Sequence, residues 1–205
     1  MITRFIALLF LLPGLAAAQA SDLRLPISLD ADSTNYDGNS SMLVFKGLRL
    51  SQGSIGIEAD EGRATKLDFA DSVWRFEGNV VIDVDSGHIE CASADLKFAD
   101  HKLILATIHG EPATFEMSRP GSDEVTRGEA ERLEYDLDSR IIEFSGDAKF
   151  SESGNQIASS FIAYNIAEQR INAESSGEGD DKVKITFTPQ ESTADETSDA
   201  GVENP

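Results

Sequence analysis

The sequence predicts an all-β fold built from stacked strand repeats, and three observations carry that prediction. Apolar and polar residues alternate through Phe76–Val84, which is typical of a strand with one buried face. A short segment of an apolar residue, any residue and glycine recurs along the chain at nearly constant spacing. No stretch shows the periodicity of a long amphipathic helix. Repeats of this length, whose neighbours share one core, indicate a stacked architecture.

The recurring segment centres on a glycine that follows an apolar residue by two positions. Its copies are Phe45-Lys46-Gly47, Phe76-Glu77-Gly78, Ile108-His109-Gly110 and Phe144-Ser145-Gly146, with Ser175-Ser176-Gly177 as a degenerate fifth. The glycines are 31 (78−47), 32 (110−78), 36 (146−110) and 31 (177−146) residues apart. Gly78 interrupts the alternation at its centre and predicts a bulge or bend. Stacked in register, the apolar residues form a stripe that is either a core or a binding interior.

A second segment recurs between the glycines and is also alternating. Its copies are Ile57-Glu58-Ala59-Asp60, Ile89-Glu90-Cys91-Ala92, Gly128-Glu129-Ala130-Glu131 and Ile157-Ala158-Ser159-Ser160, with Leu29-Asp30-Ala31-Asp32 as the first copy. An aromatic strand follows several of these copies. Each repeat is therefore expected to contain two or three short strands.

Residues 1–20 have the features of a cleaved signal peptide. Arg4 supplies the positive start, Phe5–Leu12 is apolar, and Ala18-Gln19-Ala20 fits a cleavage site of small residues. The apolar run is too short to span a bilayer. We therefore expect an exported, soluble protein; the alternative is an uncleaved membrane anchor.

The expected domain covers residues 21–189 and begins and ends with edge strands. Leu23–Leu29 alternates but contains Pro26, which is tolerated on an edge strand. Turns are expected at Asn35–Asn39 and at Pro120–Asp123, and a last alternating strand at 183–188. Residues 190–205 are rich in acidic and hydroxyl side chains and lack aromatic residues, which predicts a disordered acidic tail.

The composition narrows the possible functions. A chain of 205 residues, 40% of them hydrophobic, suffices for one domain with a real core. A net charge of −20 argues against nucleic acid as a partner, since nucleic acids bind basic surfaces. Cys91 is the only cysteine, so no intramolecular disulfide can form, and its alternating strand favours a small buried side chain.

The sequence indicates no catalytic residues, no metal ligands and no cofactor. His88, His101 and His109 lack the spacing of ligands on one strand face, and Asp83–Gly87 lacks the further ligands of a calcium loop. Asp30 and Asp32 form a carboxylate pair that leaves a carbohydrate-active enzyme as one alternative. A structural β-filament with a solid core is the other.

Several of these segments, in order, resemble the OstA-like lipopolysaccharide-transport family, in particular its soluble periplasmic bridge members. The segments run from Phe45-Lys46-Gly47 to Asp60, through Gly110-Glu111-Pro112-Ala113-Thr114-Phe115 and Gly128–Tyr135, to Phe144-Ser145-Gly146-Asp147-Ala148. The resemblance covers about Pro26 to Pro189. It implies a twisted antiparallel β-jellyroll, a folded sheet likened to a taco and open at both ends.

The resemblance also implies a location, partners and a function. Members of this family lie in the periplasm, shield the lipid A acyl chains of lipopolysaccharide, and bridge the inner and outer membranes for outer-membrane assembly. Their partners are related β-jellyroll domains of the inner- and outer-membrane components and, end to end, further copies of themselves. Open terminal strands suit such assembly, because an exposed sheet edge can pair with another strand.

Eight residues are candidates for contact with lipid. The family's motifs place Ile27, Leu29, Phe115, Tyr135 and Leu137 among them, and repeat parity alone adds Phe76, Ile108 and Phe144. The chain departs from the pattern in two places. Both Phe45-Lys46-Gly47 and Phe76-Glu77-Gly78 fit the same family segment, which implies one extra repeat. Arg49 falls where strand parity predicts an apolar residue.

Overall fold

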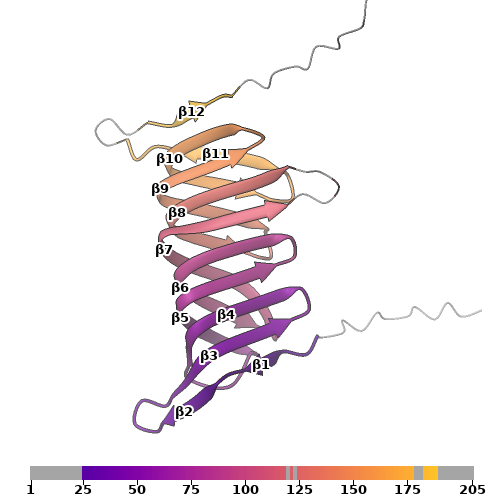
Figure 1. The fold of residues 1–205 in the computed structure, drawn as a ribbon, viewed down its shortest axis with the longest axis vertical. Helices are drawn as coiled ribbons and strands as arrows, with labels where there is room; N and C mark the ends of the chain where they lie inside the picture. The colour runs from indigo at the N-terminus through magenta and orange to yellow at the C-terminus, as the bar shows by residue number, and fades with distance from the viewer. Residues whose placement is uncertain (1–24, 119–120, 122–123, 178–181, 189–205) are drawn as a thin grey trace, which may run out of the picture.

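The protein is all-β in the computed structural model, which describes residues 25–118, 121, 124–177 and 182–188 (Figure 1). The strands are β1 (Ser28–Asp30), β2 (Ser33–Asp37), β3 (Met42–Gln52), β4 (Ile55–Ala64), β5 (Asp71–Val84), β6 (Gly87–Ala99), β7 (Lys102–Ser118), β8 (Val125–Asp136), β9 (Ile141–Glu152), β10 (Asn155–Asn165), β11 (Arg170–Glu174) and β12 (Lys184–Thr186). No helix long and apolar enough to cross a membrane occurs in the described part of the chain. The predicted signal peptide and acidic tail lie outside the described residues.

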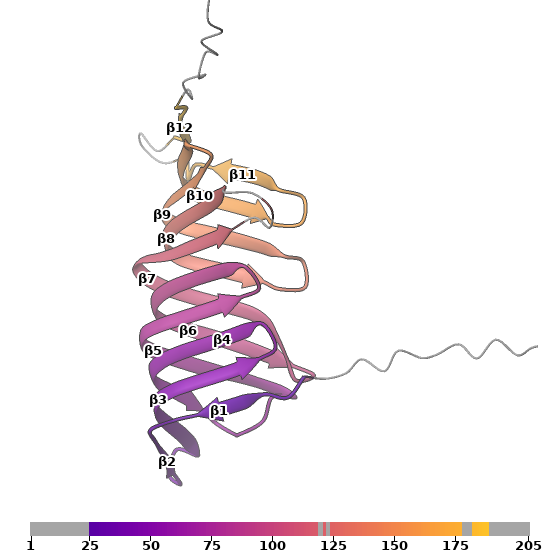
Figure 2. The same ribbon diagram turned by 45° about the vertical axis from the view of Figure 1, so that its right-hand side comes forward.

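All strands belong to one antiparallel sheet that follows the chain order. The order is β1-β3-β4-β5-β6-β7-β8-β9-β10-β11, with β2 also paired to β3 and β12 to β10. Each of the long strands β3 to β10 crosses one side of the molecule, bends, and continues across the other side (Figures 1 and 2). The result is a tall, folded sheet whose first and last strands lie at opposite ends. The predicted fold class, an antiparallel folded-sheet β-jellyroll, is therefore confirmed.

The sheet bends along a row of β-bulges near the recurring glycines. The register shifts at Glu77/Val80 between β5 and β6, and at His109/Ala113 between β7 and β8. Gly47, Gly78 and Gly146 have φ angles of 58°, 78° and 79°, which side-chain-bearing residues adopt at a cost in free energy. The bend predicted at Gly78 is thus confirmed. Ser175-Ser176-Gly177, the degenerate copy, lies beyond β11 and outside any strand.

A row of residues, nearly all of them buried, crosses the sheet from β3 to β11 next to the bend. The strand registers place its members opposite one another in the order Phe45, Gly62, Phe76, Ala94, Ile108, Leu133, Phe144, Ile162 and Ala173. Large residues from odd-numbered strands face small ones near the N-terminal end, so the two kinds interdigitate. The apolar stripe predicted from the repeats therefore exists, and it faces inward.

The bend also explains the apparent misfit of Arg49. Phe45 is buried, and the next buried residue is Leu48, three residues later rather than two or four, after which burial alternates. Arg49 consequently points outward, where its guanidinium lies 2.8 Å from the carboxylate of Glu58. The prediction that parity requires an apolar residue at Arg49 was wrong, because the left-handed backbone at Gly47 interrupts the alternation.

Other details of the predicted elements also need correction. Each repeat contains two long strands instead of two or three short ones, since the bulges bend the strands without ending them. The first turn lies at 38–41, because Asn35–Asp37 still pairs with β3. The strand predicted at 183–188 is shorter, and its side chains are exposed on both faces. Most of the loop predicted at 120–123 lies outside the described residues.

Two short strands cover the outermost long strand at each end of the sheet. At the N-terminal end, β2 pairs with the first half of β3 and β1 with the second. At the C-terminal end, β12 pairs with the first half of β10 and β11 with the second. Beyond these pairings, the outer sides of β1, β2, β11 and β12 have no neighbouring strand among the described residues.

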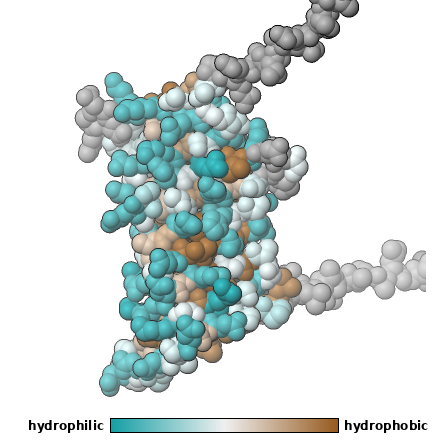
Figure 3. Space-filling model, viewed as in Figure 1, coloured by the Kyte–Doolittle hydropathy of each residue, from teal (hydrophilic) through white to brown (hydrophobic). Residues whose placement is uncertain are grey.

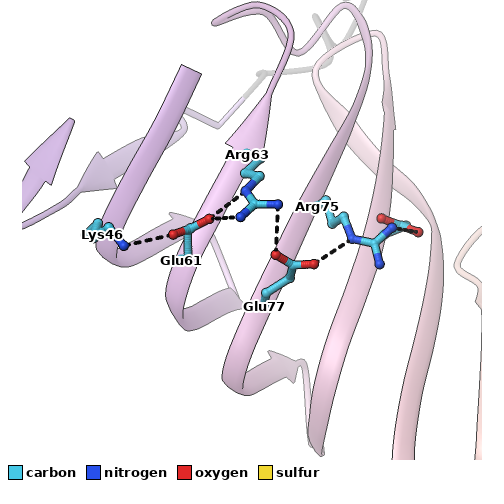
Figure 4. A network of polar contacts seen from close by, with 6 residues as sticks. Lys46, Glu61, Arg63, Arg75 and Glu77 are labelled. Atoms are coloured by element: carbon cyan, nitrogen blue, oxygen red, sulfur yellow. Dashed lines mark hydrogen bonds and ion pairs between the residues drawn. The ribbon is translucent and has the colours of Figure 1, made fainter. Parts of the chain in front are cut away.

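The outer surface is polar and carries alternating charges. Hydrophilic residues cover most of the face in Figure 3, with hydrophobic patches between them. Across β3 to β5 an ion-pair ladder joins Lys46, Glu61, Arg63, Glu77 and Arg75 (Figure 4). Hydrogen bonds from Lys46 and Arg63 lower the pKa of Glu61. Such exposed pairs add little stability individually, so the fold depends mainly on its apolar interior.

Candidate binding interior

The structure places all eight candidate residues in the apolar core inside the folded sheet or packed against it. Phe76, Ile108 and Phe144 are fully buried, and Phe115 and Tyr135 nearly so. Ile27 and Leu29 near the N-terminal end, and Leu137 in a turn, are half-buried and pack against the same core. The interior is thus one continuous apolar cluster.

Aromatic rings fill much of this interior. Trp74 stacks on Phe69, with ring centroids 4.9 Å apart, and lies 5.7 Å from Phe45 in the N-terminal half. In the other half, Phe144 contacts Phe115 edge-on at 6.1 Å and Phe150 at 6.2 Å. Such rings are close-packed as in an ordinary core. An acyl chain would therefore need the two halves of the sheet to move apart.

The open side of the fold lies between two rows of turns, which we call the seam. One row holds the turns at 38–41, 100–101, 137–140 and 166–169, and the other those at 53–54, 85–86 and 153–154. Gln52 connects the rows: its side-chain amide donates hydrogen bonds to the carbonyl oxygens of His101 at 2.7 Å and Leu25 at 3.2 Å. Gln52 is buried, so these bonds replace hydration that its amide has lost.

A narrow pocket lies at the seam and leads to the interior. Its apolar lining comes from Val84, Ile89, Phe115, Met117, Tyr135 and Ile166. Asp85 and Arg140, from turns in opposite rows, are its charged lining residues. The cavity volume of about 20 Å³ suffices for about one water molecule. Phe115 and Tyr135 are the two candidate residues that line this pocket.

Burial changes the acidity of two groups that face the interior. It raises the pKa of the Tyr135 hydroxyl, and the nearby Arg140 guanidinium opposes that rise. Burial also raises the pKa of the Cys91 thiol to about 12, so the group is neutral at physiological pH. Cys91 is partly buried and packs against the core. It lacks the ionised thiolate that nucleophilic catalysis requires.

No metal-binding cluster of three or more histidine, cysteine or carboxylate side chains occurs among the described residues. His88 and His109 are exposed, and His101 lies in a turn of the seam. His88 contacts Asp83 at 2.7 Å, and this hydrogen bond raises the pKa of its imidazole. These contacts are those of surface side chains on a polar face.

Sequence reasoning missed two residues of the seam, Gln52 and Arg140. Both lie at strand ends or in turns that are far apart in the chain, so no local spacing connects them with Tyr135 or His101. The usable signal was weak: Gln52 is a polar residue at an inward position of an alternating strand. Finding either residue requires knowledge of which turns the fold brings together.

Two comparisons with known proteins bear on this arrangement. Residues 57–170 match the model of a family described as "LptA/(LptD N-terminal domain) LPS transport protein". This match includes Phe76-Glu77-Gly78 but begins after Phe45-Lys46-Gly47. No curated protein matches the chain significantly.

The fold is also similar to a solved structure. That structure is LptH from Pseudomonas aeruginosa, described as the LptA-homologous periplasmic component of the conserved lipopolysaccharide transport device. The TM-score is 0.53 at 18% sequence identity, and the match covers 80% of this chain and 96% of that one. At this identity the likeness concerns the fold alone.

Proposed function

We propose, since this chain belongs to the LptA/LptD N-terminal domain family of lipopolysaccharide transport proteins, that it is a periplasmic component of a lipopolysaccharide bridge. In this proposal residues 1–20 direct export, and the domain at 21–189 carries the lipid. The acyl chains of lipid A occupy the interior of the folded sheet, and the sugars stay outside. The family consists of transport proteins, so the carboxylate pair Asp30 and Asp32 has no catalytic role.

The observation that carries the proposal is the continuous apolar row along the inside of the sheet. It runs from Phe45 in β3 to Ala173 in β11, so it reaches both ends of the fold. Each methylene group transferred from water to such surroundings contributes about 0.8 kcal/mol. Burial of an acyl chain therefore offsets part of the free energy that separating packed side chains costs.

Lipid binding in this proposal opens the seam rather than filling an existing cavity. The Gln52 hydrogen bonds are polar contacts that join the two rows of the seam. A hydrogen bond of this kind contributes about 1 kcal/mol. The bulges at the bend give the two halves a line about which to rotate, and the antiparallel pairing within each half stays intact.

The two ends of the sheet are proposed to join further copies and related domains. The outer sides of the terminal strands offer unpaired backbone groups for sheet extension. At the C-terminal end, Val183, Ile185 and Phe187 are exposed on alternate positions, which suits an apolar contact with the next domain. Joined end to end, the apolar rows of successive copies form one continuous path.

A titration of the purified protein with lipopolysaccharide tests the proposal. Trp74 is the chain's only tryptophan and is fully buried, so its fluorescence reports opening of the interior. We expect saturable binding with a change in Trp74 emission. The same carbohydrate without its acyl chains is the control ligand and should produce no change. Equal binding of both ligands, or none of the acylated one, would contradict the proposal.

A further inference from the structure

The pocket at the seam combines an apolar interior with a cation that has no ion-pair partner. Arg140 enters none of the ion pairs among the described residues, although the chain carries a net charge of −20. The other arginines that the structure describes each pair with a carboxylate. Those pairs are Arg49–Glu58, Arg63–Glu61, Arg75–Glu77, Arg127–Glu116, Arg132–Glu134 and Arg170–Glu168. Arg140 is the exception, and it is the arginine that lines the pocket.

The backbone holds Arg140 in place while its side chain is exposed. Its φ angle is 57° at the end of the turn 137–140, and its carbonyl oxygen accepts a hydrogen bond from the amide of Ile166 at 3.0 Å. The guanidinium lies close enough to the Tyr135 hydroxyl to oppose the effect of burial on its pKa. Arg140 is therefore fixed at the pocket mouth, with its five N–H donors available to a ligand.

The opposing acid of the pocket is already engaged. Asp85 accepts a hydrogen bond from the Ser54 hydroxyl at 2.7 Å, within its own row of turns. It forms no ion pair with Arg140. An apolar cleft with a free guanidinium at its mouth matches a molecule that has acyl chains beside a phosphate group, because arginine binds phosphate through paired hydrogen bonds.

We propose that Arg140 binds the phosphate of an acylated glycolipid at the seam, while Phe115, Met117, Tyr135 and Ile166 contact the start of its acyl chains. The inference rests on the proposed function and deepens it, since it places the boundary between head group and chains. The phosphate remains at the surface, and the chains pass inward as the seam opens. In a strongly acidic protein, this one cation also selects the orientation in which an anionic lipid can approach.

The test compares lipid A with the same lipid after removal of its phosphates. Each of the two lipids is titrated into the wild-type protein, purified as the cell produces it. Each is also titrated into the variants Arg140→Gln, Arg140→Lys and Arg170→Gln. Arg170 is the matched control: it follows the neighbouring turn, pairs with Glu168 at 2.7 Å and does not line the pocket. Inorganic phosphate alone, added as a competitor, tests whether phosphate without acyl chains suffices.

We expect Arg140→Gln to bind lipid A about tenfold more weakly than wild type, as for the loss of a charged hydrogen bond. It should bind the phosphate-free lipid like wild type, and it should lose much of the salt dependence of lipid A binding. Arg140→Lys should retain part of the affinity, and Arg170→Gln all of it. Competition by millimolar inorganic phosphate should be weak.

Three results would overturn the inference. An Arg140→Gln variant that binds both lipids equally weakly would indicate a packing role instead of phosphate binding. A variant that binds lipid A as tightly as wild type would exclude Arg140 from the contact. If the wild-type protein binds neither lipid, the proposed function itself fails. This outcome is distinguishable from the first two, in which the wild-type protein binds lipid.

Discussion

At the scale of single residues, side-chain direction separates the apolar interior from the charged outside. On each side of the bend, buried and exposed residues alternate along the strand, so neighbours such as Glu143 and Phe144 point to opposite faces of the sheet. The sequence sufficed to predict that Phe76, Ile108 and Phe144 share one face, because the repeats carry them at equivalent positions. Arg49 was misplaced, because the left-handed backbone at Gly47 interrupts the alternation of buried and exposed residues, and no local pattern in the sequence shows this.

Cys91 gives a prediction at this scale. With a pKa of about 12 in the folded protein, its thiolate fraction at pH 8 is roughly a thousandfold below that of a free cysteine. We expect iodoacetamide to leave it largely unmodified in the native state and to alkylate it quickly in urea. Mass spectrometry of samples quenched over time measures both rates. Rapid native labelling would show that the strand around Cys91 is more accessible than its partly buried position implies.

At the scale of elements, the repeat is a pair of long, bent strands. Its period of 31–36 residues corresponds to one strand in each direction with their connections. The recurring glycine marks the bend of odd-numbered strands, and an acidic side chain lies over Gly47, Gly78 and Gly146. Asp60 illustrates this, because a Cβ atom added to Gly78 would lie 2.6 Å from the Oδ2 atom of Asp60. The period was readable from the sequence, but the strand lengths were not.

Gly78→Ala tests the role of the bend. The change places a side chain at a φ of +78° and against Asp60, so we expect the free energy of unfolding to fall by about 2–4 kcal/mol. Gly154→Ala is the matched control, because its φ is +80° but its nearest neighbour is Thr188 Cβ at 3.8 Å. It should lose only about 1–2 kcal/mol. Urea unfolding measures both, and equal losses would mean that the contact at the bend contributes nothing.

At the scale of the whole molecule, the fold is a sheet that is folded along its bend on one side and has the seam between its rows of turns on the other. Its ends are short strands whose outer sides have no partner strand in the part of the chain that the structure describes. The sequence indicated edge strands through Pro26 and the alternation at 183–188. It did not indicate the seam, because the contacts of Gln52 with His101 and of Arg140 with Tyr135 depend on the twist of the complete sheet.

Ile185→Lys tests the proposed joining of copies. Ile185 is 71% exposed on β12, and a charge there opposes burial against a second copy. We expect association measured by sedimentation over a range of concentrations to weaken about tenfold, the value of burying one such side chain. Val73→Lys is the control, since Val73 is 54% exposed on the central strand β5. Equal effects of both substitutions would argue against joining through the C-terminal end.

The central claim is that the buried interior of this folded sheet opens to carry acyl chains. Photo-crosslinking in living cells tests it most directly, with a photoreactive residue placed at Phe144 in one variant and at Glu143 in another. Phe144 is fully buried inside the sheet, and Glu143 is its exposed neighbour on the same strand. The account predicts a lipopolysaccharide adduct at Phe144 and none at Glu143, with both variants present at normal levels. Lipopolysaccharide adducts at Glu143 alone would contradict this claim. It would also be contradicted if Phe144 formed no lipid adduct while protein adducts formed at the terminal strands, and that result would indicate a solid-cored filament.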